Sequence, residues 1–247
     1  MTTNDDDVSP RVTVERDGHV LLIGLNRVDK RNAADMRLLQ ELSLAYGMLE
    51  RDPELRVGFV FAHGDHFTAG LDLADVGPHI GAEGLDLVPE GGINPWQVSG
   101  EQLTKPDVVI AADSTVFGQI EVSRGILPFG GATIRFPRAV GWGNAMRWVL
   151  TGETFPVSEA HRIGLVQEVV KHGEQYDRGL EIARRIAAQA PLAVQAALVN
   201  ARLAIRQGDA AAEASLQPEL VRLAQTEDTR IGMESFLTRQ PANFIGR

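Results

Sequence analysis

The sequence predicts an α/β fold that is followed by a helical region. In the first two thirds of the chain, short apolar runs bounded by turn residues alternate with helical patterns. Strands separated by helices pair in parallel, because a parallel pair needs a long crossover connection. After Gly173 the pattern is helical to the end. With 247 residues, of which 44% are hydrophobic, the chain can bury the core of one domain with an appendage.

The first two strands are expected as a hairpin. Residues 12–26 contain two β-rich runs, and Asp17 and Gly18 between them are a strong turn signal. The residues before the hairpin are polar and acidic, so we expect residues 1–10 to be a disordered tail. A helix should follow the hairpin, because apolar residues recur at helical spacing until a proline stops the pattern, at Leu38, Leu42, Ala45, Leu49 and Pro53.

Three further runs are expected as strands. Residues 57–64, VGFVFAHG, are nearly all apolar, which is typical of a strand covered on both faces. Residues 108–113, VVIAAD, and 116–122, VFGQIEV, have the same character. Residues 74–104 are rich in glycine and proline and predict a long irregular loop. Such a loop either covers a pocket or is a mobile part of the surface.

The C-terminal helices carry clear start and stop signals. Pro191 suits the first turn of one helix, and Gly208 stops it. Thr226 is the expected N-cap of the last helix, with Glu227 and Asp228 well placed in its first turn. The apolar faces of this region include Leu192, Ala196, Val199, Leu203, Leu216, Leu220 and Leu223. They expose more apolar surface than a small appendage can bury by itself.

Composition excludes several classes of protein. The formal charge of −9 argues against a nucleic-acid partner, because binding a phosphate backbone needs clustered Lys and Arg. The absence of cysteine excludes a disulfide framework and a thiol nucleophile. No apolar run approaches the ~18 residues of a membrane span, and the N-terminus has no secretory-signal pattern. We therefore expect a cytoplasmic protein with no membrane partner.

Two kinds of site are disfavoured. His63 and His66 flank a turn, but no third ligand follows at a metal-binding spacing, so we expect no metal. Ser114 and Ser123 lack the GxSxG elbow of a serine hydrolase.

Several segments of the sequence resemble segments of a known family, and they occur in the same order along the chain. They are LNRVDKRNAADM (25–36), GDHFTAGLDL (64–73), the pair at 105–106, IAADSTVFGQIEV (110–122), RGILPFGGA (124–132), TGETFPVSEAHRIGLVQEVV (151–170) and TEDTRIGMESFLTRQPANFIGR (226–247). Together they resemble the crotonase family of enoyl-CoA hydratases and isomerases. The resemblance implies a crotonase-like spiral of ββα repeats in residues 11–190. It also implies a helical oligomerisation region in residues 191–247, which packs between the subunits of a homo-trimer or hexamer.

The resemblance also implies an oxyanion hole for a thioester carbonyl. The residue after the glycine of the second segment donates one backbone N–H in that family, so Leu71 is the expected donor, and Gly70 lets the backbone approach closely. Ala69, Asp72 and Leu73 are expected beside the substrate. Asp72 and Leu73 should open a helix whose dipole adds to the field.

The first segment and Phe129 are the other expected substrate contacts. Arg27, Lys30 and Arg31 form a basic turn that is either a solvated surface or, with Ala33, the site for the phosphates of CoA. Phe129 stands where the family usually has glycine and is bulky enough to shorten or reshape the acyl pocket.

Glu121 is the expected catalytic carboxylate. In an apolar run, a glutamate is either an edge-strand surface charge or a partly desolvated acid–base group, and the resemblance favours catalysis. Hydratases of this family use two glutamates around one water, and only one of the pair is visible here.

The expected function is therefore hydration of a 2-enoyl-CoA through an enolate, without a cofactor, because CoA is part of the substrate. An isomerase, a decarboxylase or a hydrolase on the same scaffold stays open, as does a catalytically silent acyl-CoA-binding protein.

One part of the family pattern is absent. After its Lys-Pro pair the family has a strand, a glycine turn with the second oxyanion donor, and a helix, but here Lys105 and Pro106 lead straight to Asp107. Because a sheet would not tolerate losing a crossover of roughly 20 to 25 residues, we expect the protein to contain this block. The Cα atoms near Pro106 and Asp107 should then lie much more than the ~3.8 Å of a trans peptide apart. A normal peptide with a repaired sheet would instead mark a true deletion.

Overall fold

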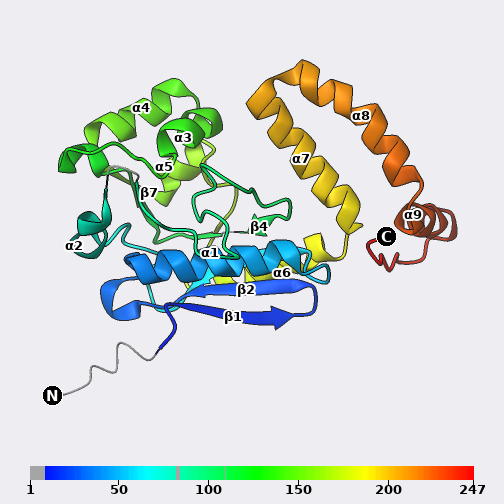
Figure 1. The fold of residues 1–247 in the computed structure, drawn as a ribbon, viewed down its shortest axis with the longest axis horizontal. Helices are drawn as coiled ribbons and strands as arrows, with labels where there is room; N and C mark the ends of the chain where they lie inside the picture. Colours follow the sequence, from blue (N-terminus) through cyan, green and yellow to red (C-terminus); the bar gives the residue numbers. More distant parts are fainter. Residues whose placement is uncertain (1–8, 82–83, 109) are drawn as a thin grey trace. The chain divides into compact units, whose positions relative to one another are not determined.

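The computed structural model describes residues 9–81, 84–108 and 110–247 (Figure 1). Residues 1–8 of the expected disordered tail lie outside the described residues. The chain divides into two compact units. The first combines Met1–Pro95, Glu101–Val108 and Ile182–Arg247, and the second combines Trp96–Gly100 and Val109–Glu181. The expected mixed α/β fold is confirmed, because the described chain contains both strands and helices.

A four-stranded sheet organises the first unit. β1 (Val12–Asp17) and β2 (Val20–Leu25) are antiparallel, and β3 (Val57–Ala62) and β4 (Asp107–Val108) follow in parallel. The predicted hairpin is confirmed, but its turn lies one residue later than expected, between Asp17 and Val20. Gly18 has φ +58° in this two-residue loop, which is the conformation that a type II′ turn reserves for glycine.

The predicted first helix is also confirmed. α1 (Met36–Arg51) lies along one face of the sheet (Figure 1) and is N-capped by the Asp35 side chain, which accepts a 2.8 Å hydrogen bond from Leu38 N. Leu38, Ala45 and Leu49 are buried, as their spacing predicts, and the helix ends at Arg51, just ahead of Pro53.

The glycine-rich loop is irregular, as predicted, after a short start in α2 (Leu73–Val76) and the 3₁₀ helix η3 (Gly77–His79). It is packed against α1. Ile93 is 1% exposed and donates its N–H to Ser43 O at 2.9 Å, and a Cβ on Gly47 would lie 1.9 Å from Gly91 O. Residues 91–93 of the loop are therefore packed against α1.

The expected break beside Pro106 is not present. Gly58 N donates to Pro106 O at 2.9 Å, and Gly58 is the register partner of Asp107, so Pro106 and Asp107 follow one another along the same ladder. Lys105, which is 4% exposed, donates to Leu49 O and Asp52 O at 2.7 and 2.6 Å. Lys105 is thus held at the end of α1 by these hydrogen bonds, and the chain enters the sheet two residues later at Asp107.

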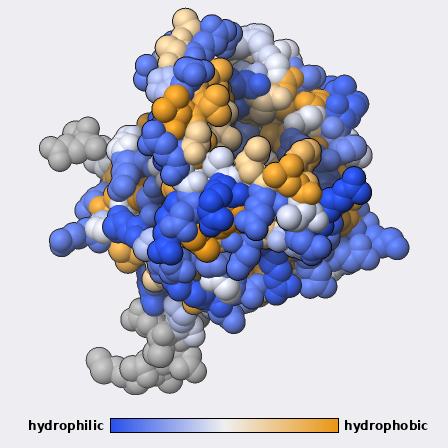
Figure 2. Space-filling model, turned by 90° about the vertical axis from the view of Figure 1, so that its right-hand side faces the viewer, coloured by the Kyte–Doolittle hydropathy of each residue, from blue (hydrophilic) through white to orange (hydrophobic). Residues whose placement is uncertain are grey.

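The C-terminal helices were predicted correctly. They are α6 (Gln175–Ala187), α7 (Pro191–Gln207), α8 (Asp209–Ala224) and α9 (Glu227–Thr238). Thr226 caps α9 by accepting from Thr229 N at 3.2 Å. Six apolar residues of α8 and α9 are at least 50% exposed, namely Leu216, Leu220, Val221, Met233, Phe236 and Leu237. On the face that Figure 2 shows, apolar residues in orange lie among hydrophilic ones in blue.

The described residues of the second unit include two small sheets and the helices between them. β5 (Ala111–Ala112) pairs in parallel with β8 (Val169–Val170), and β6 (Val116–Gly118) pairs antiparallel with β7 (Thr154–Pro156). The strand predicted over residues 108–113 is therefore divided between two sheets. The helices α3 (Ala132–Val140), α4 (Trp142–Thr151) and α5 (Val157–Arg162) were not predicted.

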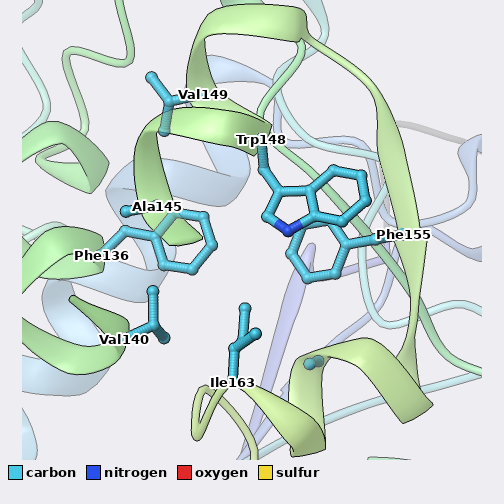
Figure 3. Close-up of a cluster of buried hydrophobic side chains, with 8 residues drawn as sticks. Phe136, Val140, Ala145, Trp148, Val149, Phe155 and Ile163 are labelled. Atoms are coloured by element: carbon cyan, nitrogen blue, oxygen red, sulfur yellow. The ribbon is translucent and has the colours of Figure 1, made fainter. Parts of the chain in front are cut away.

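An aromatic cluster holds this unit together. The Phe155 ring lies 4.6 Å from that of Trp148 and 6.1 Å from that of Phe136, measured between centroids, and Figure 3 shows these side chains pointing toward one another. Phe155 is 2% exposed. The β7 strand is thereby fixed against α3 and α4, and β7 in turn carries β6, the strand that leads to Glu121.

The strand predicted over residues 116–122 is wrong for Glu121. β6 ends at Gly118, and Glu121 begins the 3₁₀ helix η4 (Glu121–Arg124). The Ser123 hydroxyl donates to Ile120 O at 2.7 Å, a local side-chain bond that competes with a strand ladder.

No helix among the described residues is long and apolar enough to cross a membrane.

Candidate active site

The two segments of the first unit that the sequence singled out lie side by side. Ala34 and Leu71 form a short parallel bridge, in which Ala34 N donates to Gly70 O at 2.8 Å and Asp72 N donates to Ala34 O at 2.9 Å. Gly70 has φ +88°, a conformation that favours glycine. The turn after β3 is therefore joined to the turn after β2 at the position expected of the oxyanion donor.

The N–H of Leu71 is left without an acceptor among the described residues. In a parallel bridge the neighbours of the central residue make the hydrogen bonds, so its own N–H points the other way. Leu71 itself is half-buried, whereas Gly70 and Ala69 are exposed. A preorganised donor that points away from its own backbone partner can bind a developing negative charge.

The helix expected at Asp72 and Leu73 is a single turn. α2 has four residues, and Asp72 is its N-cap without a side-chain capping bond. Few peptide dipoles are aligned in one turn, so the helix adds little to the field at Leu71. Leu73 is 39% exposed.

The basic turn divides into one partly buried and two exposed cations. The Arg27 side chain is 11% exposed, and its guanidinium lies 3.0 Å from Asp35 and 2.7 Å from Asp72. Arg27 also donates to Ala33 O at 2.9 Å. Lys30 and Arg31 are exposed. Arg27 thus ties the basic turn to the start of α2, while Lys30 and Arg31 face solvent.

Glu121 lies in the second unit, at the first residue of η4. Its Oε2 atom is buried and has no hydrogen-bond partner among the described residues, and the same is true of Gln119 Oε1. Gln119 also lines a cavity of about 240 Å³ together with Phe117, Phe136 and Phe155. A buried carboxylate oxygen without a protein donor is costly unless water or a ligand satisfies it.

Phe129 is held by an aromatic partner that the sequence did not suggest. Its ring meets that of Trp96 edge-on, with centroids 5.4 Å apart and an interplanar angle of 84°. Trp96 comes from the glycine-rich loop, where nothing in the local pattern marks it as a contact of Phe129.

The side chains that were disfavoured as metal ligands or as a serine nucleophile make the following contacts. His63 Nε2 lies 2.8 Å from the Thr13 hydroxyl, and neither His63 nor His66 belongs to a cluster of three metal-binding side chains in the part of the chain described. Ser114 Oγ lies 3.1 Å from His172 Nδ1, and both residues are exposed.

Comparison with known proteins identifies a family. Residues 102–247 match the family model described as enoyl-CoA hydratase/isomerase. An enoyl-CoA hydratase of Mycobacterium tuberculosis is 30% identical over 253 residues, which cover 93% of this chain and 90% of that protein. A 2,3-dehydroadipyl-CoA hydratase of Escherichia coli is 32% identical over 254 residues, which cover 95% of this chain and 98% of that protein.

Solved structures give the same result. A probable enoyl-CoA hydratase/isomerase from Mycobacterium abscessus superposes with a TM-score of 0.93 at 53% identity, covering 96% of this chain and 99% of that one. An enoyl-CoA hydratase from M. tuberculosis superposes with a TM-score of 0.86 at 28% identity, covering 97% of this chain and all of that one. The two sequence alignments given above are longer than the 247 residues of this chain, so both contain positions that this chain lacks.

The Arg27–Asp72 contact should make the free energy of unfolding depend on pH in the acid range. The hydrogen bond from Arg27 holds the pKa of Asp72 below its usual range. Ionised Asp72 therefore stabilises the folded state above the unfolded pKa of about 3.9, and this contribution is lost as the pH falls through the lower folded pKa. We expect Asp72→Asn to reduce the free energy of unfolding at pH 7, with a difference from wild type that shrinks below about pH 4.

Urea unfolding at pH 7 and pH 3 measures this difference. Asp65→Asn, at an exposed position of the preceding turn, is the matched control and should leave the free energy of unfolding unchanged. A deficit of Asp72→Asn that is the same at both pH values would contradict the assignment.

Proposed function

Because this chain belongs to the enoyl-CoA hydratase/isomerase family, we propose that it adds water to the double bond of a 2-enoyl-CoA thioester. The observation that carries the proposal is the Leu71 amide, which follows a left-handed glycine and has no acceptor among the described residues. Such a donor suits the oxygen of a thioester that passes through an enolate. The names of the relatives, which include enoyl-CoA and 2,3-dehydroadipyl-CoA hydratases, support the same class of substrate.

Glu121 is the acid–base group of the proposed reaction. Water adds its oxygen to the β-carbon of the enoyl group, the electrons of the double bond move to the thioester oxygen as an enolate, and a proton then reaches the α-carbon. Leu71 N–H stabilises the enolate oxygen, and Glu121 accepts a proton from water or delivers one to the α-carbon. The buried Oε2 of Glu121, which no described residue hydrogen-bonds, supports this role. The reaction needs no cofactor beyond the CoA that the substrate carries.

The chain should be a weak hydratase. Lys105 and Pro106 lead directly into β4, so the sequence lacks the glycine turn that brings the second oxyanion donor in the resembled family. Losing one such donor costs about 3 to 4 kcal/mol of transition-state stabilisation, or roughly 10² to 10³ in turnover. The same enolate chemistry serves isomerases, decarboxylases and hydrolases, and a protein without any turnover would be an acyl-CoA-binding member of the family.

The exposed cations Lys30 and Arg31 are proposed to bind the phosphates of CoA. Arg27 supports them indirectly, because its ion pairs with Asp35 and Asp72 fix the turn that carries them. Ala33 and Phe129 stay predicted substrate contacts.

A homo-oligomer and a cytoplasmic location complete the proposal. The exposed apolar residues of α8 and α9 support a trimer or hexamer, because apolar patches of this kind mark contact surfaces. The location is a prediction from composition.

Crotonyl-CoA tests the catalytic proposal. We expect the protein to remove the conjugated absorbance of this thioester, and Glu121→Gln to lower turnover by roughly 10² or more with little change in acyl-CoA binding. Glu153→Gln, at an exposed glutamate of the same unit, is the control and should keep wild-type turnover. Turnover that survives in Glu121→Gln would remove Glu121 from the mechanism.

Charge reversal tests the CoA site. The double variant Lys30→Glu, Arg31→Glu should weaken CoA binding at low salt, and the deficit should shrink as added salt screens the charges. The double glutamine variant at the same positions should lie between wild type and reversal. Isothermal titration with CoA gives the dissociation constants. Equal values for all three proteins would exclude this turn as the site that binds the CoA phosphates.

Light scattering after size exclusion tests the assembly. We expect a mass of three or six chains for the wild type, and a smaller species for Phe236→Glu with Leu237→Glu, because two charges would enter an apolar contact. Thr238→Glu adds charge at an exposed polar position of the same helix and should leave the assembly intact. A monomeric wild type would be the contrary result.

A further inference from the structure

We propose that Asn32 and Thr68 are positioning residues that aim the Leu71 N–H at the thioester oxygen. The inference rests on the proposed function. Neither side chain needs to touch the substrate, because both act through the backbone of residues 63–71.

Asn32 is the buried centre of the arrangement. It is 1% exposed and has φ +55°, a left-handed conformation that asparagine tolerates better than most residues. Its side-chain N–H groups donate to His63 O at 2.9 Å and His66 O at 2.7 Å, and its Oδ1 accepts from Arg27 N at 2.7 Å. A buried amide with both donors and its acceptor satisfied fixes the groups that it contacts.

The bonds of Asn32 hold the turn that leads to the donor. His63 and His66 stand at either side of Gly64, directly after β3. His63 N also donates to Leu25 O at 2.9 Å, which continues the β2–β3 ladder into the turn. The start of the turn is thus held by the sheet, and Asn32 fixes its path from there to His66.

Thr68 carries the same constraint closer to Leu71. Its hydroxyl donates to Asn32 O at 2.7 Å and accepts from Gly70 N at 3.1 Å. One hydroxyl therefore bridges the backbone of Asn32 to the N–H of the left-handed glycine. Valine at this position would have nearly the same shape but neither bond.

The orientation of Leu71 N–H follows from the planarity of one peptide unit. Gly70 C=O and Leu71 N–H belong to the same trans peptide, so they point in opposite directions. Gly70 O accepts from Ala34 N at 2.8 Å, which turns Leu71 N–H away from Ala34. Asn32 and Thr68 hold the backbone on the N-terminal side of this peptide, and the bridge to Ala34 holds the peptide itself.

Threonine substitutions separate positioning from general stability. We expect Thr68→Val to lower kcat on crotonyl-CoA by about 10-fold or more, with KM nearly unchanged, because small misplacement of a catalytic group is costly to the rate. Thr68→Ser keeps the hydroxyl and should retain wild-type kcat. Thr104→Val is the matched control, since it removes a hydroxyl that donates to Glu50 at 2.6 Å, and it should also retain wild-type kcat.

The infrared carbonyl stretch of bound butanoyl-CoA, labelled with ¹³C at the thioester carbon, reports on the donor directly. Wild type and Thr68→Ser should shift this band to lower frequency, and Thr68→Val should return it toward its value in water. Asn32→Asp, which keeps the side-chain shape but removes both amide donors, should behave like Thr68→Val if it folds.

Three results would overturn the inference. A wild-type shift that Thr68→Val leaves in place, with unchanged kcat, refutes it while the proposed function stands. An equal loss of kcat in Thr68→Val, Thr68→Ser and Thr104→Val would assign the effect to general destabilisation. A wild-type protein that binds butanoyl-CoA without any carbonyl shift refutes the inference and the oxyanion role of Leu71 together.

Discussion

The hydrogen bonds between the turn after β2 and the turn after β3 are the constraint on which the candidate donor depends. The described residues of the two turns form no regular ladder, and glycine is free to adopt many backbone conformations, so neighbouring contacts are needed to select the left-handed conformation of Gly70. The bridge at Ala34 supplies that fixation, and the largely buried Arg27 guanidinium adds an ion pair across the same junction. The cost of burying this charge is offset because Asp35 and Asp72 both face it.

A second constraint is the close contact between α1 and the glycine-rich loop. Small residues on one side of α1, Ser43 and Gly47, leave room for the loop. A Cβ at Gly47 would collide with the loop carbonyl of Gly91, and a Cβ at Gly92 in the loop would collide with the Ser43 hydroxyl. A glycine inside a helix costs about 1 kcal/mol relative to alanine, so this close approach explains its presence. The contact continues to Lys105, whose ammonium binds two carbonyl groups at the end of α1. These contacts fix the position of Lys105, and β4 begins two residues later in a defined register with β3.

The continuity at Pro106 changes how the active site is understood. A two-residue strand in the fourth position of the sheet is enough to pair with β3, so the first unit keeps an ordered edge without the crossover that the family pattern has there. What the short path does not supply is a second glycine turn. The proposed reaction therefore relies on the described Leu71 N–H and on the Glu121 carboxylate, which is the physical basis for expecting slow hydration.

The sequence by itself determined the hairpin, α1, the irregular loop, the C-terminal helices and the family, because these depend on signals between residues close in the chain. Apolar spacing, the Asp35 and Thr226 caps and the Gly18 turn act within a few residues. The prediction that Leu71 is an oxyanion donor came from the family resemblance. Only the tertiary structure showed that Glu121 begins a 3₁₀ helix and that Arg27 forms ion pairs with carboxylates. It also showed that the Asn32 side chain donates hydrogen bonds to the backbone oxygens of His63 and His66. The contacts of Arg27 with Asp72 and of Asn32 with His63 and His66 join residues tens of positions apart, and a local pattern cannot specify which distant group will satisfy a buried charge or amide.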